Sequence, residues 1–325
     1  MKHSMFTKGL RFLVITSAVM VAATLVAATA PAPTLTLEAA WRGNGATWLI
    51  NGVGELYELR PGQPIRRALL LTENGRARRW SRTPTSLANW KNQWFVTDGS
   101  NTMARFDAKG AFTGAISLPV RAANVIAAGP QLWIVNSAAP SPAEQLYSST
   151  DGRTFKPYRR EGERFATPMD NVLIIGGSGA GELWASRVVG PPVISRLAPG
   201  PAKNVPVAYS RSKFRSTMES VTGLVDDVTI YSLPVRDLLP LDRSGVVVLR
   251  NREDVEDQSG KVIPFLGRRA DRYDAGGKHT GTAVFPDSVH WIASVDQSGV
   301  TGVSRAGKVL TAKWGQQVPG TVLKR

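Results

Sequence analysis

The chain has 325 residues, of which 42% are hydrophobic and 20% charged, so it can bury a core and is not intrinsically disordered. Lysine and arginine total 40 against 25 acidic residues, and the formal net charge of +15 favours an anionic partner. Cysteine is absent, which excludes a disulfide framework, cysteine-ligated zinc and thiol catalysis. The three histidines, His3, His279 and His290, are too few for a histidine-rich metal site.

Residues 1–30 have the pattern of a secretory signal peptide or an N-terminal membrane anchor. A basic start is followed by residues 12–28, which contain no charge. That run is at the short end of the ~17–25 residues that span a bilayer, and its Ala, Thr and Ser content favours a cleaved signal. We expect cleavage before Thr29, an extracytoplasmic mature protein, periplasmic or secreted, and a linker over residues 31–40.

Residues 41–325 predict a single all-β domain. Short runs rich in Val, Ile, Leu, Trp and Phe alternate with clusters of Gly, Asp, Asn, Ser and Pro, as in proteins built of many short antiparallel strands. One unit recurs about every 40 residues, and this period indicates a β-propeller. A strand of each copy begins at one of six positions: Trp48, Trp94, Trp133, Leu173, Val246 and Trp291.

The six copies predict six propeller blades. The long interval between Leu173 and Val246 leaves room for a seventh around residues 221–235, which is the alternative. Residues 34–40 or residues 317–323 could close the ring by completing the blade at the other end of the chain. Neighbouring blades bury their apolar faces against each other, and recurrent tryptophans would supply much of that area. The tryptophans are Trp48, Trp94, Trp133, Trp184 and Trp291.

Two hairpins in these copies have the residues of known propeller motifs. The stretch VTDGSNTMARFDAKGAF resembles an NHL repeat at Asp98, Asn101, Arg105, Phe106, Asp107 and Gly110. The stretch SSTDGRTF is similar to the Asp-box of sialidase-like propellers at Ser149, Asp151, Gly152, Thr154 and Phe155. Each resemblance covers one blade and implies a hairpin whose Asp accepts backbone N–H groups. Both imply a fold and neither implies an activity.

An exported hydrolase or lyase with a site in the central channel is the alternative to a binding protein. Sialidase-type hydrolysis needs converging arginines and a tyrosine nucleophile, and no arginine-bearing motif precedes the first blade. Metal-dependent propeller enzymes use histidines near the channel, but His279 and His290 are more simply polar strand or loop residues. We therefore favour a protein that is not an enzyme. Two carboxylates with a Tyr or His in an enclosed channel mouth would favour catalysis.

Two other motifs are better explained as hairpin turns than as ligand sites. Residues 253–257 concentrate four carboxylates, so calcium could bind near Asp254 and Asp257, but the run lacks the Asn and Gly of a calcium loop. The stretch GGSGAG, residues 176–181, lacks both the following helix and the Lys-Ser/Thr pair of a phosphate loop. We expect no cofactor.

Arginines interleaved with aromatic residues are the candidate binding residues, because arginine makes bidentate contacts to carboxylates and phosphates. They are Arg78, Arg79, Trp80, Arg82, Tyr158, Arg159, Arg160, Arg268 and Arg269. Export argues against a nucleic acid as partner. We expect a monomeric propeller that acts as a binding or scaffolding module. Its basic rim would engage an acidic polysaccharide, an anionic membrane surface or an acidic protein.

Overall fold

A computed structural model describes residues 35–136, 138–158, 173–187, 193–198, 203–206, 235–256 and 262–315. The chain divides into two compact units, Met1–Leu35 and Thr36–Arg325, and the fold below is that of the second. The expected signal peptide, the possible seventh blade at 221–235 and the candidate closing segment at 317–323 lie outside the described residues. In the part that is described, no helix has the length and apolar character needed to cross a membrane.

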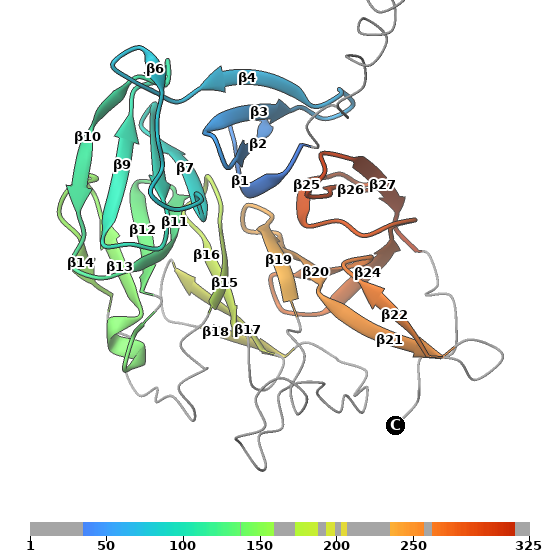
Figure 1. Ribbon diagram of the computed structural model, residues 1–325. Coiled ribbons are helices and arrows are strands. Elements are labelled where there is room, and N and C mark those ends of the chain that lie inside the picture. Colours follow the sequence, from blue (N-terminus) through green and yellow to red (C-terminus); the bar gives the residue numbers. More distant parts are fainter. Residues whose placement is uncertain are drawn as a thin grey trace, which may run out of the picture. The chain divides into compact units, whose positions relative to one another are not determined.

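The second unit is a six-bladed β-propeller, which confirms the prediction from the repeats (Figure 1). Its blades are antiparallel sheets in which consecutive strands pair, except that in blade 5 β20 pairs with β23. Within the described residues the last blade has three strands where the others have four. Blade 1 comprises β1 (Leu37–Gly43), β2 (Ala46–Asn51), β3 (Glu55–Leu59) and β4 (Arg66–Leu70). Blade 2 comprises β7 (Ser86–Trp90), β8 (Gln93–Thr97), β9 (Thr102–Phe106) and β10 (Phe112–Ser117). Blade 3 comprises β11 (Ala122–Ala128), β12 (Gln131–Asn136), β13 (Leu146–Ser149) and β14 (Lys156–Pro157). Blade 4 comprises β15 (Leu173–Gly177), β16 (Leu183–Arg187), β17 (Val193–Ala198) and β18 (Lys203–Pro206). Blade 5 comprises β19 (Val235–Pro240), β20 (Gly245–Arg250), β23 (Arg269–Asp274) and β24 (His279–Val284). Blade 6 comprises β25 (Trp291–Val295), β26 (Gly299–Val303) and β27 (Val309–Lys313).

The first strand of each blade lies nearest the central channel (Figure 1). Short elements are added to this plan: the hairpin β5 (Thr72–Glu73) and β6 (Arg76–Ala77), the 3-10 helix η1 (Pro142–Glu144), and the hairpin β21 (Arg252–Glu256) and β22 (Val262–Leu266) inside blade 5. Because β1 begins at Leu37, residues 37–40 form the inner strand of blade 1. They therefore do not complete the last blade, which was one of the two expected ways to close the ring.

Five apolar clusters lie between consecutive blades, from the junction of blades 1 and 2 to that of blades 5 and 6. Trp94, Trp133 and Trp184 are buried in three of them, and Trp48 packs edge-on against Trp94 at 4.9 Å between ring centroids. The expected role of these tryptophans is confirmed. Trp291 differs, because it lines the channel.

The GGSGAG stretch ends β15 and forms the hairpin turn to β16, as predicted. Its first two glycines let the inner strands of blades 3, 4 and 5 approach closely. A Cβ on Gly176 would lie 2.6 Å from the carbonyl oxygen of Leu238, and one on Gly177 would lie 2.7 Å from that of Ala127. The glycines therefore serve blade packing rather than a bound phosphate.

The two motif hairpins have the hydrogen bonds that their resemblances imply. Asp107 accepts the backbone N–H groups of Lys109 and Ala111 at 2.9 and 2.8 Å. Asp151 accepts those of Arg153 and Thr154, both at 2.8 Å. These backbone donors hold the pKa of Asp151 well below its usual range.

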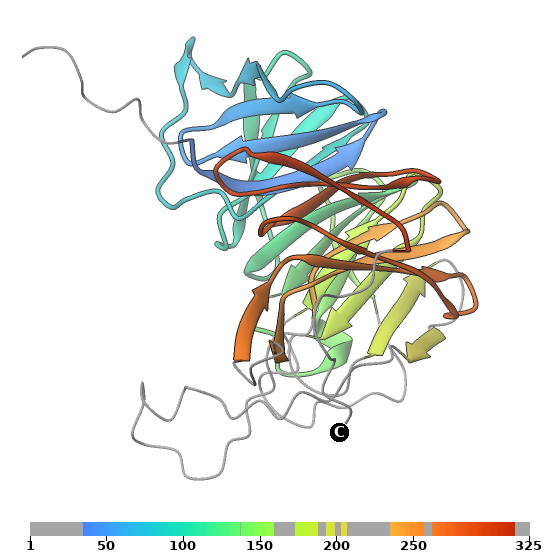
Figure 2. The ribbon, with the colours of Figure 1, turned by 90° about the vertical axis from the view of Figure 1, so that its right-hand side faces the viewer.

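The junction of blades 6 and 1 is held by polar contacts, and none of the five apolar clusters among the described residues lies there. Both views of the ribbon place β1 beside the strands of blade 6 (Figures 1 and 2). The Leu37 N–H donates to the Arg305 carbonyl at 2.8 Å, and the Thr47 hydroxyl donates to the Ala293 carbonyl at 2.6 Å. The ring therefore closes through hydrogen bonds that join the first and last blades.

Candidate functional site

Arg78 and Trp80 pack inside the connection between blades 1 and 2. The Arg78 guanidinium lies over the Phe112 ring at 4.2 Å and over the Trp80 ring at 5.3 Å, and it donates to Glu73 at 2.9 Å. Its side chain is only 18% exposed. Trp80 in turn packs against Phe106. These contacts give both residues a structural role.

Arg79 and Arg82 lie in the same segment and are exposed, and so is Arg76 of β6. None of the three makes an ion pair with another residue in the described ranges. In the same segment, the carboxylate of Asp98 accepts a hydrogen bond from the Ser81 hydroxyl at 3.3 Å. Because these three exposed arginines fall within seven residues, we call residues 76, 79 and 82 the arginine strip.

Tyr158 follows β14 in blade 3 and serves packing there. Its hydroxyl donates to the Leu197 carbonyl of blade 4 at 2.8 Å, and its ring meets Trp133 edge-on at 5.0 Å. The two neighbouring candidate binding residues, Arg159 and Arg160, lie outside the described residues. Tyr158 therefore links blades 3 and 4.

Arg268 and Arg269 are partly buried in blade 5. Arg268 Nε donates to the Phe285 carbonyl at 3.0 Å, and Arg269 Nε donates to the buried carboxylate of Asp271 at 2.9 Å. Those predicted binding residues that the structure describes are thus distributed over the blade 1–2 connection, blade 3 and blade 5, and the fold does not gather these into one surface. Asp254 lies in β21, and Asp257 lies outside the described residues.

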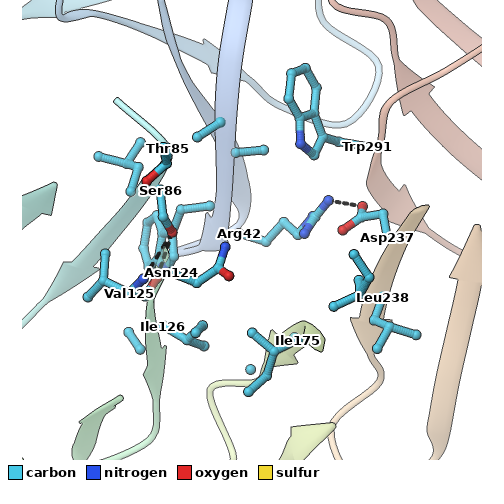
Figure 3. A pocket seen from close by; sticks show the side chains of 18 of the residues that line it. Arg42, Thr85, Ser86, Asn124, Val125, Ile126, Ile175, Asp237, Leu238 and Trp291 are labelled. Carbon is cyan, nitrogen blue, oxygen red and sulfur yellow. Dashed lines mark hydrogen bonds and ion pairs between the residues drawn. The ribbon is translucent and has the colours of Figure 1, made fainter. Parts of the chain in front are cut away.

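A cavity of about 170 Å³ lies in the central channel and is lined by inner strands of all six blades. Its apolar wall includes Ile126, Ile175 and Leu238 (Figure 3). Two cationic and two anionic side chains also line it: Arg42, Arg236, Glu38 and Asp237. Because their formal charges cancel, the cavity has no excess of either sign.

β-Bulges place the polar side chains in this cavity. In β1, β11 and β19 the register shifts at the second residue of the strand, and the residue after the shift is Ala39, Asn124 or Asp237. A bulge re-aims the side chains that follow it. Asn124 and Asp237 therefore occupy equivalent positions in blades 3 and 5, and both line the cavity.

Arg42 and Asp237 form an ion pair across the cavity (Figure 3). Arg42 Nε also donates to the Ile292 carbonyl at 2.6 Å, and the Ile292 N–H donates to Asp237 at 2.7 Å. Burial raises the pKa of Asp237, while the Arg42 guanidinium and the Ile292 N–H oppose that rise. The pair joins blades 1, 5 and 6.

Three other polar groups that line the cavity make no hydrogen bond with another described residue. The Asn124 amide points toward Arg42 and makes no side-chain hydrogen bond with another described residue (Figure 3). The same holds for the Trp291 indole N–H and for Arg42 Nη1 within the described part of the chain. These groups come from blades 3, 6 and 1 and converge on one space.

Arg236 and His290 lie where β19 and β25 begin. Arg236 donates to Asn251 at 3.0 Å and to the Val289 carbonyl at 2.9 Å. Burial, followed by the charges of Arg236 and Arg305, lowers the pKa of His290 to about 4. His290 is therefore neutral at physiological pH.

The two carboxylates that line the cavity, Glu38 and Asp237, each lie beside an arginine. No Tyr or His is among the described residues that line the cavity. Asp237 is paired with Arg42, and Glu38 lies 3.6 Å from Arg305. Among the described residues no group of three or more His, Cys, Asp or Glu side chains is arranged to hold a metal ion.

The fold and the cavity define a six-bladed β-propeller with a polar channel site. No protein-family description matches the sequence, and no curated protein matches it either. Similar solved structures include YCF48 bound to a D1 peptide, with 15% identity, 87% of this chain and 81% of that chain covered, and a TM-score of 0.47. A gluconolactonase from Xanthomonas campestris has 13% identity, 86% coverage of both chains and a TM-score of 0.48. The extracellular domain of BT4673 from B. thetaiotaomicron has 12% identity, with 88% of this chain and 39% of that chain covered, and a TM-score of 0.47. The likeness in each case is one of fold.

Proposed function

We propose that this chain is an exported β-propeller binding protein that engages an anionic macromolecule through the arginine strip. The observation that carries the proposal is the contrast within one segment. Arg78 is neutralised by Glu73 and packed over aromatic rings, whereas Arg76, Arg79 and Arg82 are exposed without ion-pair partners in the described ranges. Clustered arginines without partners attract carboxylate, sulfate or phosphate groups.

The signal-like residues 1–30 support export. An extracytoplasmic propeller would meet acidic polysaccharides, anionic lipid surfaces and acidic proteins rather than nucleic acid. Fractionation of expressing cells should recover the protein outside the cytoplasm, with residues 1–28 removed. Recovery of a cytoplasmic protein with an intact N-terminus would contradict export, and an intact N-terminus in the membrane fraction would indicate an anchor.

The arginine strip is tested by a triple variant, Arg76→Gln, Arg79→Gln and Arg82→Gln, on immobilised heparin, on phosphatidylglycerol vesicles and on polyglutamate. We expect earlier elution or weaker binding on at least one of these probes and an unchanged melting temperature. The matched control removes three exposed cations elsewhere: Lys109→Gln, Arg153→Gln and Lys156→Gln. Equal losses in both triple variants would mean that net charge alone causes retention, and the proposed surface would be wrong.

A further inference from the structure

The channel cavity has the properties of a ligand site that is separate from the arginine strip. Its unused groups are the Asn124 amide, the Trp291 indole N–H and Arg42 Nη1, which come from three different blades. An inward-facing polar side chain is normally satisfied by the protein or by water. Convergent unused groups in a concave space are the usual mark of a binding site.

The charges of the cavity select against an ionic ligand. Arg42 is paired with Asp237, Glu38 is paired with Arg305, and Arg236 is held by three acceptors of blades 5 and 6. In Figure 3 the Arg42 side chain lies between Asn124 and Asp237, so an ammonium group placed beside Asn124 would lie next to the Arg42 guanidinium. Arg42 repels such a cation, and because Arg42 is already paired with Asp237 it offers an anion little net charge. An uncharged ligand meets no such opposition.

The donors, acceptors and walls define the ligand further. Indole and guanidinium groups only donate hydrogen bonds, while the Asn124 amide both donates and accepts. The ligand must therefore offer several acceptor oxygens and at least one donor. Ile126 and Ile175 give it an apolar wall, and a volume of about 170 Å³ is below the ~300–1,000 Å³ of sites for drug-sized molecules.

We propose that the channel cavity binds a small uncharged polyhydroxyl compound of about the size of one sugar ring, with Asn124 as its main hydrogen-bonding residue. Hydroxyl groups supply both donors and acceptors. The C–H faces of the sugar ring would pack against Ile126, Ile175 and Trp291. Asn124 is a binding residue in this site. Arg42 would both contact the ligand and help to close the propeller ring, so substituting it would change ligand binding and folding together.

The experiment measures saturation-transfer NMR of the purified full-length protein with glucose, galactose and mannose, and with the charged analogues glucuronate and glucosamine. We expect at least one neutral sugar to bind at about 10 mM or below, a range typical of weak single-site binding, and the charged analogues to bind more weakly. Asn124→Ala should weaken the neutral sugar by about tenfold, because it removes a hydrogen-bonding pair. The exposed residue Asn101 gives the matched control Asn101→Ala, which should leave sugar binding unchanged.

Failure of all three neutral sugars to bind, preference for a charged analogue, or unchanged binding by Asn124→Ala would each overturn the proposal. Asn124→Ala should fold normally, because the amide makes no hydrogen bond with another described residue. The triple variant of the arginine strip should keep sugar binding, and Asn124→Ala should keep heparin retention. Failure of one proposal is therefore distinguishable from failure of the other.

Discussion

Arg42 in blade 1 and Asp237 in blade 5 are joined by an ion pair, and the backbone of Ile292 in blade 6 bonds to both side chains. Three blades meet at this pair, on the side of the ring where hydrogen bonds replace an apolar cluster. A buried ion pair contributes little net stability compared with an apolar replacement, but loss of one partner leaves a charge without compensation. The pair therefore makes ring closure depend on both residues.

Arg42→Met should lower the free energy of unfolding by about 3–5 kcal/mol, because Asp237 then stays buried without its cation. The double variant Arg42→Met with Asp237→Leu should recover much of that loss. Urea denaturation measures both. Arg60→Met is the control, because Arg60 is half exposed and Arg66 still pairs with Glu58, so its cost should stay under about 1 kcal/mol. An Arg42→Met protein as stable as the control would contradict the role of the pair.

Arg78→Met and Arg79→Met should separate a packed arginine from an exposed one. Arg78 loses its position over the Phe112 ring and its bond to Glu73, so we expect a loss of about 1–2 kcal/mol. Arg79→Met should stay within about 0.5 kcal/mol, as surface substitutions usually do. Thermal melts of both proteins test this. Equal effects would show that the contacts of Arg78 contribute nothing.

Gly110→Ala should destabilise the protein more than Gly45→Ala, although both glycines have positive φ angles, 82° and 71°. A Cβ on Gly110 would lie 2.7 Å from the carbonyl oxygen of Leu70, whereas nothing lies within 4 Å of one on Gly45. Gly45→Ala should cost about 1 kcal/mol for the backbone conformation alone. Gly110→Ala should cost about 1–3 kcal/mol more, because blade 2 must move away from blade 1. Chemical denaturation of the two variants makes the comparison.

Acidification should weaken the fold through His290. Its pKa is lowered to about 4 in the folded protein by burial and by Arg236 and Arg305, whereas the unfolded chain takes up that proton near pH 6.5. Between these values the unfolded state binds more protons, so the stability falls as the pH falls. His290 is only half buried, so we expect a loss of about 1–2 kcal/mol rather than the ~3 kcal/mol of the full shift. His290→Gln should lack this part of the loss between about pH 6.5 and 4, and an identical pH profile for both proteins would contradict it.

The repeats predicted the all-β class and six blades because strand alternation and turn residues are local properties of the chain. The same holds for the Asx turns at Asp107 and Asp151, whose bonds span only a few residues. The strands beginning near Trp94 and Trp133 were correctly placed for this reason.

The roles of individual arginines could not be read in the same way. Arg78 and Arg79 are neighbours in sequence and have the same composition around them, but the loop after β6 places one over the Phe112 ring and leaves the other in solvent. Arg268 and Arg269 likewise find acceptors in blade 5, the Phe285 carbonyl just after β24 and Asp271 of β23. A charge cluster in the sequence indicates cations and does not show which of them are already paired.

The channel site was missed because its residues carry no local signal. Arg42 and Asp237 are 195 positions apart, and Asn124 follows a β-bulge that shows only in the pairing of β11 with β12. Composition, charge and periodicity by themselves determined the propeller class, the basic balance and the expectation of export. Only the tertiary structure decided which arginines are free, how the ring closes and what lines the channel, because these depend on contacts between blades that are distant in sequence.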